Sequence, residues 1–228
     1  MCFAQDFELR QLKTVTGKDT LYHSWHISKY GDSTVIKSFY GNERWRYNIG
    51  NNGEINTLLV YDPNEDVYLW CQRNSRKIHF KGKIEGEKVD NTVELDDDLW
   101  MQHVAYCLNI FTTGDKEIVK FNVVHTPTMD VYKMRAKKEA IDTLDFLGCK
   151  TPARRLRFSF AGFFAPFWSA SYWLSDEDGI FIKYRGRNSF PPAPITTIET
   201  ISIETVEQDT VLGLRQEMDF ISNPPWRN

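Results

Sequence analysis

The stretch LYHSWHI, residues 21–27, alternates between apolar and more polar side chains with a period of two. Because successive side chains of a β-strand point to opposite faces, Leu21, Trp25 and Ile27 lie on the same side of the chain. This pattern predicts a strand with one apolar and one more polar face. Strands of this kind build antiparallel sheets that cover a core on one side.

Similar segments follow, separated by clusters of Gly, Asn, Asp and Pro that indicate turns. Asp62-Pro63-Asn64-Glu65 and Asp176-Glu177-Asp178-Gly179 are the clearest of these turns, and Leu147-Gly148-Cys149 predicts a bend. The predicted strands are 34–40, 45–49, 54–61, 67–72, 77–81, 118–125, 131–137, 139–143, 155–160, 168–174, 180–185 and 195–206, with a short further segment at 211–220. The proline-rich stretch 190–194 is too short and too late to divide domains, so we expect a single mainly β domain over residues 1–228.

One segment follows the helical period instead. After Asp96-Asp97-Asp98, the apolar residues Trp100, Val104, Cys107, Leu108 and Phe111 recur at helical spacing. Asp98 is the expected N-cap, because a carboxylate there accepts hydrogen bonds from free N–H groups and suits the helix dipole. Gly114 is the expected terminator. The sequence therefore predicts one amphipathic helix over about residues 98–111.

Composition excludes two classes of function. The chain has 228 residues, a net charge of −3 and a pI of about 6.0, which argues against a nucleic-acid partner because that would need a basic stripe. The densest basic segment, Arg154 to Arg157, alternates with apolar positions and favours a solvated strand face over a phosphate contact. No apolar run approaches the roughly 18 residues of a transmembrane helix.

Catalytic and metal motifs are absent from the sequence. His23 and His26 lie three apart on a predicted strand, so they point to opposite faces and do not share a metal. No CxxC pair, glycine-rich phosphate loop, GxSxG or HExxH motif occurs. We therefore assign no catalytic residue, no metal ligand and no cofactor, although a hydrolase with an unrecognised site remains an alternative.

The four cysteines leave alternatives open. Cys71 and Cys107 form either a disulfide or two buried free thiols, and Cys149 has no assigned partner. Residues 1–5 read either as the remnant of a signal peptide behind an added Met or as the start of the chain, and Cys2 is a candidate for lipidation.

The stretch FSFAGFFAPFW, residues 158–168, is the most unusual in the chain. So many aromatic residues around one Gly and one Pro indicate either the lip of an apolar groove or a membrane-touching loop. The simpler interpretation, a core hairpin packed against the helix, is the one we favour.

The order of these features resembles the bacterial envelope proteins of the domain-of-unknown-function 3108 family. The resemblance rests on Asp97 to Leu108, on Val131 to Thr143 with Gly148 and Arg155 to Arg157 beyond, and on Tyr172 to Arg185. It spans roughly residues 7–206. It implies a periplasmic or outer-membrane-associated location and a half-barrel, lipoprotein-carrier-like fold. In that fold one large curved antiparallel sheet, a half-barrel or open barrel, holds the helix against its concave face. It implies no catalytic residue.

A curved sheet that one helix covers only in part leaves an apolar face to be filled by side chains, a ligand or a partner. The first hypothesis is therefore non-enzymatic binding of an apolar ligand, such as a lipid or acyl chain, in the groove between sheet and helix. Strand parity gives the lining candidates, which are Trp25, Phe121, Phe158, Phe160, Trp168 and Tyr172. The alternative is an envelope scaffold or assembly protein that binds another protein through a sheet edge or through Phe163 and Phe164.

Overall fold

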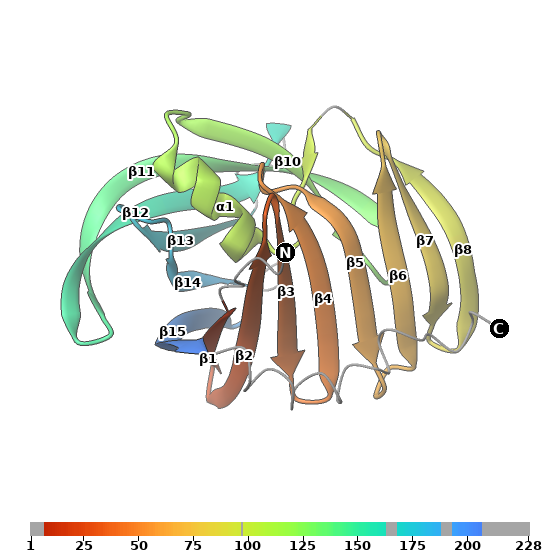
Figure 1. Cartoon of the computed structure of the whole chain (residues 1–228), viewed down its shortest axis with the longest axis horizontal. Helices are drawn as coiled ribbons and strands as arrows, with labels where there is room; N and C mark the ends of the chain where they lie inside the picture. Colours follow the sequence, from red (N-terminus) through yellow and green to blue (C-terminus); the bar gives the residue numbers. More distant parts are fainter. Residues whose placement is uncertain (1–6, 97, 163–167, 188–192, 207–228) are drawn as a thin grey trace.

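The computed structural model describes residues 7–96, 98–162, 168–187 and 193–206 of the chain. The strands in this part form a single sheet (Figure 1). Their bounds are β1 Phe7–Thr16, β2 Asp19–Tyr30, β3 Ser33–Tyr40, β4 Glu43–Gly50, β5 Ile55–Asp62, β6 Val67–Asn74, β7 Lys77–Ile84, β8 Glu87–Glu94, β9 Leu99–Trp100, β10 Ile118–His125, β11 Asp130–Phe146, β12 Cys149–Phe160, β13 Ser169–Ser175, β14 Phe181–Arg187 and β15 Ile195–Val206. The one α-helix of the described ranges is α1, Val104–Thr113.

The sheet is almost entirely an antiparallel meander. Its order is β8-β7-β6-β5-β4-β3-β2-β1-β15-β14-β13-β12-β11-β10-β9. Consecutive strands pair with each other except β8 and β9, which lie at opposite ends of this order. The first half, β1–β8, joins the second half, β9–β15, where β1 pairs with β15. The exception to the antiparallel pattern is β9, which pairs with β10 in parallel through Leu99–Phe121 and Trp100–Asn122. The result is one large open sheet whose edge strands, within the described ranges, are β8 and β9.

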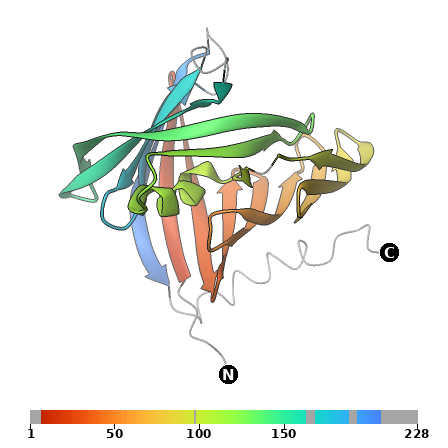
Figure 2. The same cartoon turned by 90° about the horizontal axis from the view of Figure 1, so that it is seen from above.

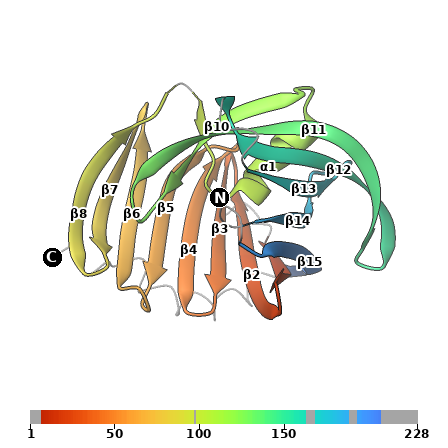
Figure 3. The ribbon, with the colours of Figure 1, turned by 180° about the vertical axis from the view of Figure 1, so that it is seen from behind.

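The sheet bends over on itself and holds helix α1 inside the bend. Seen from above, the strands of the first half and β10–β12 form two walls with α1 between them (Figure 2). From behind, β10–β13 cross in front of the helix (Figure 3). Apolar residues from both halves and from the helix belong to one core, in which Phe80, Trp100, Phe121 and Phe181 are fully buried. The half-barrel with a helix on its concave side, expected from the sequence, is confirmed.

The start of the helix differs from the expectation. Asp98 is not its N-cap: residues 99–100 are extended in β9, and the helix begins after His103, which has no side-chain capping bond. No acidic residue lies in the first turn. The reason is that pairing of β9 with β10 satisfies the backbone there and delays the helix by about one and a half turns relative to 98. Gly114 does end the helix, donating its N–H to the carbonyl oxygen of Ile110, although its φ of −84° is not left-handed.

The strand predictions also need correction. Strands β1 and β8 were not predicted. The predicted strands 131–137 and 139–143 are one strand, β11, whose register shifts between Lys138 and Ala140. The bend at 147–149 is a turn in which Leu147 and Gly148 both have positive φ. Residues 1–5 and the segment 211–220 lie outside the described ranges, so the single-domain assignment and the signal-peptide remnant stay predictions.

Candidate ligand site on the concave face

Two turns from opposite halves of the sheet hold helix α1 in place. Gly53 lies in the β4–β5 turn and Gly179 in the β13–β14 turn, both with positive φ. A Cβ atom on Gly53 would lie 2.8 Å from the carbonyl oxygen of Cys107, and one on Gly179 would lie 2.8 Å from that of Asn109. The turns therefore approach the helix backbone too closely for any side chain, and the helix covers this end of the concave face.

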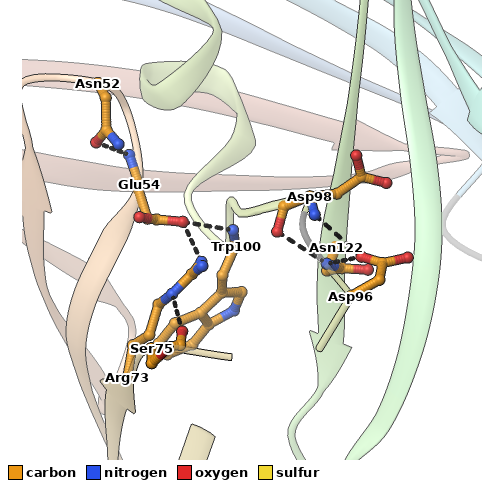
Figure 4. Close-up of polar contacts among 8 residues, drawn as sticks. All are labelled: Asn52, Glu54, Arg73, Ser75, Asp96, Asp98, Trp100 and Asn122. Carbon is orange, nitrogen blue, oxygen red and sulfur yellow. Dashed lines mark hydrogen bonds and ion pairs between the residues drawn. The ribbon is translucent and has the colours of Figure 1, made fainter. Parts of the chain in front are cut away.

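The segment before the helix is tied down at two points, which Figure 4 shows. At the first, the carboxylate of Glu54 accepts the backbone N–H of Trp100 at 3.4 Å and pairs with Arg73. Arg73 also donates from Nε to the carbonyl oxygen of Ser75 at 2.8 Å. Glu54 itself donates its backbone N–H to Asn52 Oδ1 at 3.1 Å. This network joins β9 to the first half of the sheet.

The second tie holds the same segment to the second half. Asn122 on β10 donates from Nδ2 to Asp96 Oδ1 at 2.8 Å and to the carbonyl oxygen of Asp98 at 3.1 Å (Figure 4). Lys133 pairs with Asp96 at 2.5 Å. The Lys133 ammonium and, less strongly, the Asn122 amide lower the pKa of Asp96 to about 2. The acidic cluster predicted to cap the helix therefore serves instead, through Asp96, to fix the chain that leads into it.

The structure brings the six predicted lining residues onto the inner face, in one aromatic cluster. The ring of Phe158 lies 5.7 Å from Phe121, 5.3 Å from Trp168 and 5.6 Å from Tyr172, measured between ring centres. Phe160 packs on Trp168 at 5.8 Å. Trp25 joins the cluster through a residue that the sequence prediction missed, Phe181, whose ring lies 5.5 Å from Trp25 and 6.2 Å from Tyr172.

The six predicted lining residues differ in how far they are buried. Trp25, Phe121 and Phe158 are buried, whereas Phe160, Trp168 and Tyr172 are half-buried. A ligand reaches the buried three only if they move, since they already contact one another or the core. Phe163 and Phe164, the predicted partner-binding residues, lie outside the described ranges.

An apolar slot opens on the concave face away from the helix. It has a volume of about 260 Å³ and is lined by Trp45, Val60, Val67, Leu69, Ile84 and Pro127, with Thr126 beside Pro127. Pro127 belongs to the β10–β11 turn and the others to β4–β7, so the slot lies between the two halves of the sheet. Asp62, Glu65 and Glu85 are its charged lining residues. Strand parity alone does not find this site, because its far wall comes from a turn more than forty positions away in the chain.

Trp45 connects the slot to a second hollow and to the aromatic cluster. A wider basin of about 640 Å³, lined by Leu21, Tyr40, Trp45, Tyr47 and Gln102 among others, shares Trp45 with the slot. Ring contacts then run inward from Trp45 to Tyr47 at 6.1 Å, from Tyr47 to His103 at 4.8 Å and from His103 to Trp25 at 4.4 Å. An aromatic row thus leads from the slot to the predicted lining residues.

The titratable groups along this row are held uncharged. Burial lowers the pKa of His23 to about 4 and that of His103 to about 3, so both rings are neutral at pH 7. Burial also holds the pKa of Tyr47 and Tyr172 well above the ordinary value of a phenol. Charged groups near this row are Arg10, which is buried and paired with Glu8, and Glu43, which lines the basin beside Tyr47. Such an interior suits an apolar molecule better than an ion.

Cys71 and Cys107 are buried free thiols, so of the two alternatives that the sequence left open the disulfide is not formed. Burial raises the pKa of both. Cys149 is exposed and free. Within the described ranges no three His, Cys, Asp or Glu side chains gather in an arrangement that would hold a metal ion, and no helix is long and apolar enough to cross a membrane.

Among solved structures, the chain is similar to a β-barrel-like protein of the domain of unknown function DUF1849 from Brucella abortus. The TM-score is 0.59 at 7% sequence identity, and the match covers 91% of this chain and all of that one. At this identity the likeness concerns the fold, and it agrees with the large open sheet described above.

Weaker likenesses are to the hypothetical lipoprotein YmcC from Escherichia coli and to a putative outer membrane lipoprotein-sorting protein domain from Vibrio parahaemolyticus. The first has a TM-score of 0.40 at 8% identity, covering 89% of this chain and 91% of that one. The second has a TM-score of 0.31 at 8% identity, covering 93% and 91%. No protein-family model and no curated protein matches the sequence, so membership of the 3108 family is not shown.

Proposed function

We propose that this protein binds an apolar molecule, such as a lipid or an acyl chain, on its concave face and catalyses no reaction on it. The observation that carries the proposal is the slot between β4–β7 and the β10–β11 turn, whose wall is built from Trp45, Val60 and Leu69 among other apolar side chains. Ligand sites are concave and mostly apolar, with a few polar groups that fix orientation. The carboxylates of Asp62, Glu65 and Glu85 are the polar groups here.

None of the six aromatic residues predicted from the sequence lines the slot itself, and in this proposal they form a second, inner part of the site. An acyl chain that exceeds the slot in length reaches the row Tyr47, His103 and Trp25 only if these buried rings move apart, because they pack on one another. The half-buried Tyr172 and Trp168 lie beyond it in the same cluster. Aromatic rings offer such a chain a large apolar surface at a small cost in side-chain entropy.

An envelope location and a relationship to the 3108 family belong to the same proposal. They rest on the residues that carry the resemblance, from Asp97 to Leu108, from Val131 to Thr143 and from Tyr172 to Arg185. The confirmed half-barrel supports them because it is the fold that this resemblance implies. Binding of another envelope protein, the second hypothesis from the sequence, rests either on a sheet edge, which is β8 or β9 here, or on Phe163 and Phe164, of which the described part of the chain shows nothing.

The test compares two aromatic-to-alanine variants. Trp45→Ala removes a wall of the slot, whereas Tyr22→Ala removes an aromatic ring that is 60% exposed on β2. Binding of dodecanol is measured by displacement of a polarity-sensitive dye, and co-purified lipid by native mass spectrometry. We expect Trp45→Ala to weaken binding by roughly tenfold, which corresponds to about 1.4 kcal/mol, and Tyr22→Ala to leave it unchanged.

A filling variant keeps the proposal testable if Trp45→Ala also disturbs the fold. Val67 is half-buried at the start of β6 and lines the slot, so Val67→Trp occupies it with a residue that strands accept readily. This variant should retain the wild-type unfolding midpoint and lose dodecanol binding. A protein that carries no lipid and binds no dodecanol, or that binds it equally in all three variants, would refute the proposal.

A further inference from the structure

Strand register collects basic side chains on the outer face of the second half of the sheet. Arg157 on β12 pairs with Ser171 on β13, and Ser171 pairs with Arg185 on β14. In the adjacent row Arg155 pairs with Trp173, which pairs with Lys183. Residues paired across antiparallel strands lie on the same face. This is the outer face, because the alternate residues Tyr172, Leu174 and Tyr184 point into the core.

The outer face is hollowed where these rows run. The hollow has a volume of about 520 Å³, and its lining includes Arg155, Arg185 and Arg187 together with Ser171 and Trp173. It lies on the opposite side of the sheet from the slot and shares no lining residue with it, although Trp168 of the aromatic cluster also lines this hollow. The sequence favoured a solvated face for Arg154 to Arg157. Arg157 is indeed exposed, but its neighbour Arg155 lines a concave site.

The positive charges of the hollow are only partly neutralised. Arg155 lies 3.3 Å from Glu139 and 3.4 Å from Asp142, and the same Asp142 carboxylate accepts the indole N–H of Trp173 at 2.7 Å. Arg187 donates to the carbonyl oxygen of Ala193, and this neutral acceptor does not compensate the charge of the guanidinium group. Arg185 is exposed and has no hydrogen-bond or ion-pair partner among the residues that the structure describes.

We propose that this hollow binds the phosphate group of a phosphate ester. Arg185 and Arg187 contribute guanidinium forks that match phosphate oxygens, and Ser171 adds a neutral hydroxyl donor between Arg157 and Arg185. Glu139 and Asp142 hold Arg155 in place at the wall and leave the other arginines to the ligand.

The size of the hollow indicates what carries the phosphate. Ligand sites in proteins range over about 300–1,000 Å³, and this hollow of about 520 Å³ falls within that range. A free phosphate ion would leave most of it empty, so the group is the end of a larger molecule. Two sources share this chemistry: a soluble phosphate ester and the headgroup of an anionic phospholipid.

The experiment uses the full chain and two probes. Glycerol 3-phosphate is titrated by isothermal calorimetry, and vesicles of phosphatidylglycerol in phosphatidylcholine are compared with pure phosphatidylcholine in a flotation assay. Arg185→Gln/Arg187→Gln removes two charges that line the hollow. Its matched control, Lys29→Gln/Lys88→Gln, removes two charges from exposed lysines of β2 and β8 in the other half of the sheet.

A soluble ester is the source if glycerol 3-phosphate binds and the arginine variant weakens binding about tenfold while the lysine variant does not. A headgroup is the source if only the phosphatidylglycerol vesicles bind, with the same dependence on the two arginines. Added salt should weaken either interaction. The proposal is overturned if neither probe binds, or if both variants reduce binding equally, because the effect is then one of net charge.

Discussion

Gly53 and Gly179 hold the backbone of helix α1 from the two halves of the sheet, at Cys107 and at Asn109. A Cβ atom added to either glycine would lie 2.8 Å from a carbonyl oxygen of the helix. Both glycines also have positive φ, 79° at Gly53 and 71° at Gly179. The helix is therefore fixed by backbone contact between a hairpin turn and a helix turn, as well as by its apolar face.

This contact predicts that alanine is costly at both positions. Gly53→Ala and Gly179→Ala should each lower the free energy of unfolding by about 3 kcal/mol, because the helix must move in addition to the left-handed strain of about 1–2 kcal/mol. Gly148→Ala is the control: its φ is 83° and no atom of the described residues lies within 4 Å of the added Cβ. Urea denaturation measures all three, and equal losses in the three variants would mean that the turns do not hold the helix.

Asp96 predicts a dependence of stability on pH below 4. Lys133 and Asn122 lower its pKa to about 2 from an ordinary 3.8, so between these values the unfolded chain binds more protons than the folded one. The stability contributed by Asp96 is present above pH 3.8 and is lost as the pH falls toward 2. Asp96→Asn should abolish this part of the slope in urea midpoints across the acid range. Asp98→Asn should keep it, because Asp98 contacts Asp96 through its backbone N–H, which this substitution leaves in place. Loss of the slope in both variants would mean that the Asp98 carboxylate also contributes.

The buried histidines make a second contribution to folding stability, which begins to be lost at a higher pH than that of Asp96. Burial lowers the pKa of His23 to about 4 and of His103 to about 3, whereas both titrate near 6.5 in the unfolded chain. Their contribution is therefore present above pH 6.5 and is lost as the pH falls toward the folded values. NMR should show two imidazole side chains whose resonances stay constant from pH 7.5 to 5 in the folded protein and shift in urea. Movement of all imidazole signals in the folded state would contradict their burial.

Alternation predicted most strands, and its failures have physical causes. Strand β1 was missed because Glu8 and Arg10 occupy its inner face, where they pair with each other. In the sequence, such charged residues indicate a solvent-exposed face. Strand β8 was missed because its residues are mostly exposed on both faces, so no apolar stripe marks it. The helix start was misplaced since Asp96 is engaged by Asn122 and Lys133, partners that local sequence does not reveal.

Prediction of the candidate ligand site from the sequence is limited in the same way. Strand parity placed Trp25, Phe121 and Phe158 on one inner face, because the alternation of side chains within a strand determines the face on which each lies. It did not indicate that Phe181 would join them, nor that Pro127 would face Trp45 across the slot. Both depend on how far the whole sheet curves, which no single strand encodes.

The carboxylates of the slot predict a preference among apolar ligands of equal length. Asp62, Glu65 and Glu85 line the slot, so a ligand that carries its own carboxylate meets like charges and loses hydration as it enters. Dodecanol should bind roughly tenfold more tightly than dodecanoate at about pH 8, where the acid is ionised. Glu65→Gln/Glu85→Gln should narrow this difference by strengthening dodecanoate binding alone, in the same dye-displacement assay. If dodecanoate binds as tightly as dodecanol, or if the double variant strengthens both ligands equally, these carboxylates do not select the ligand.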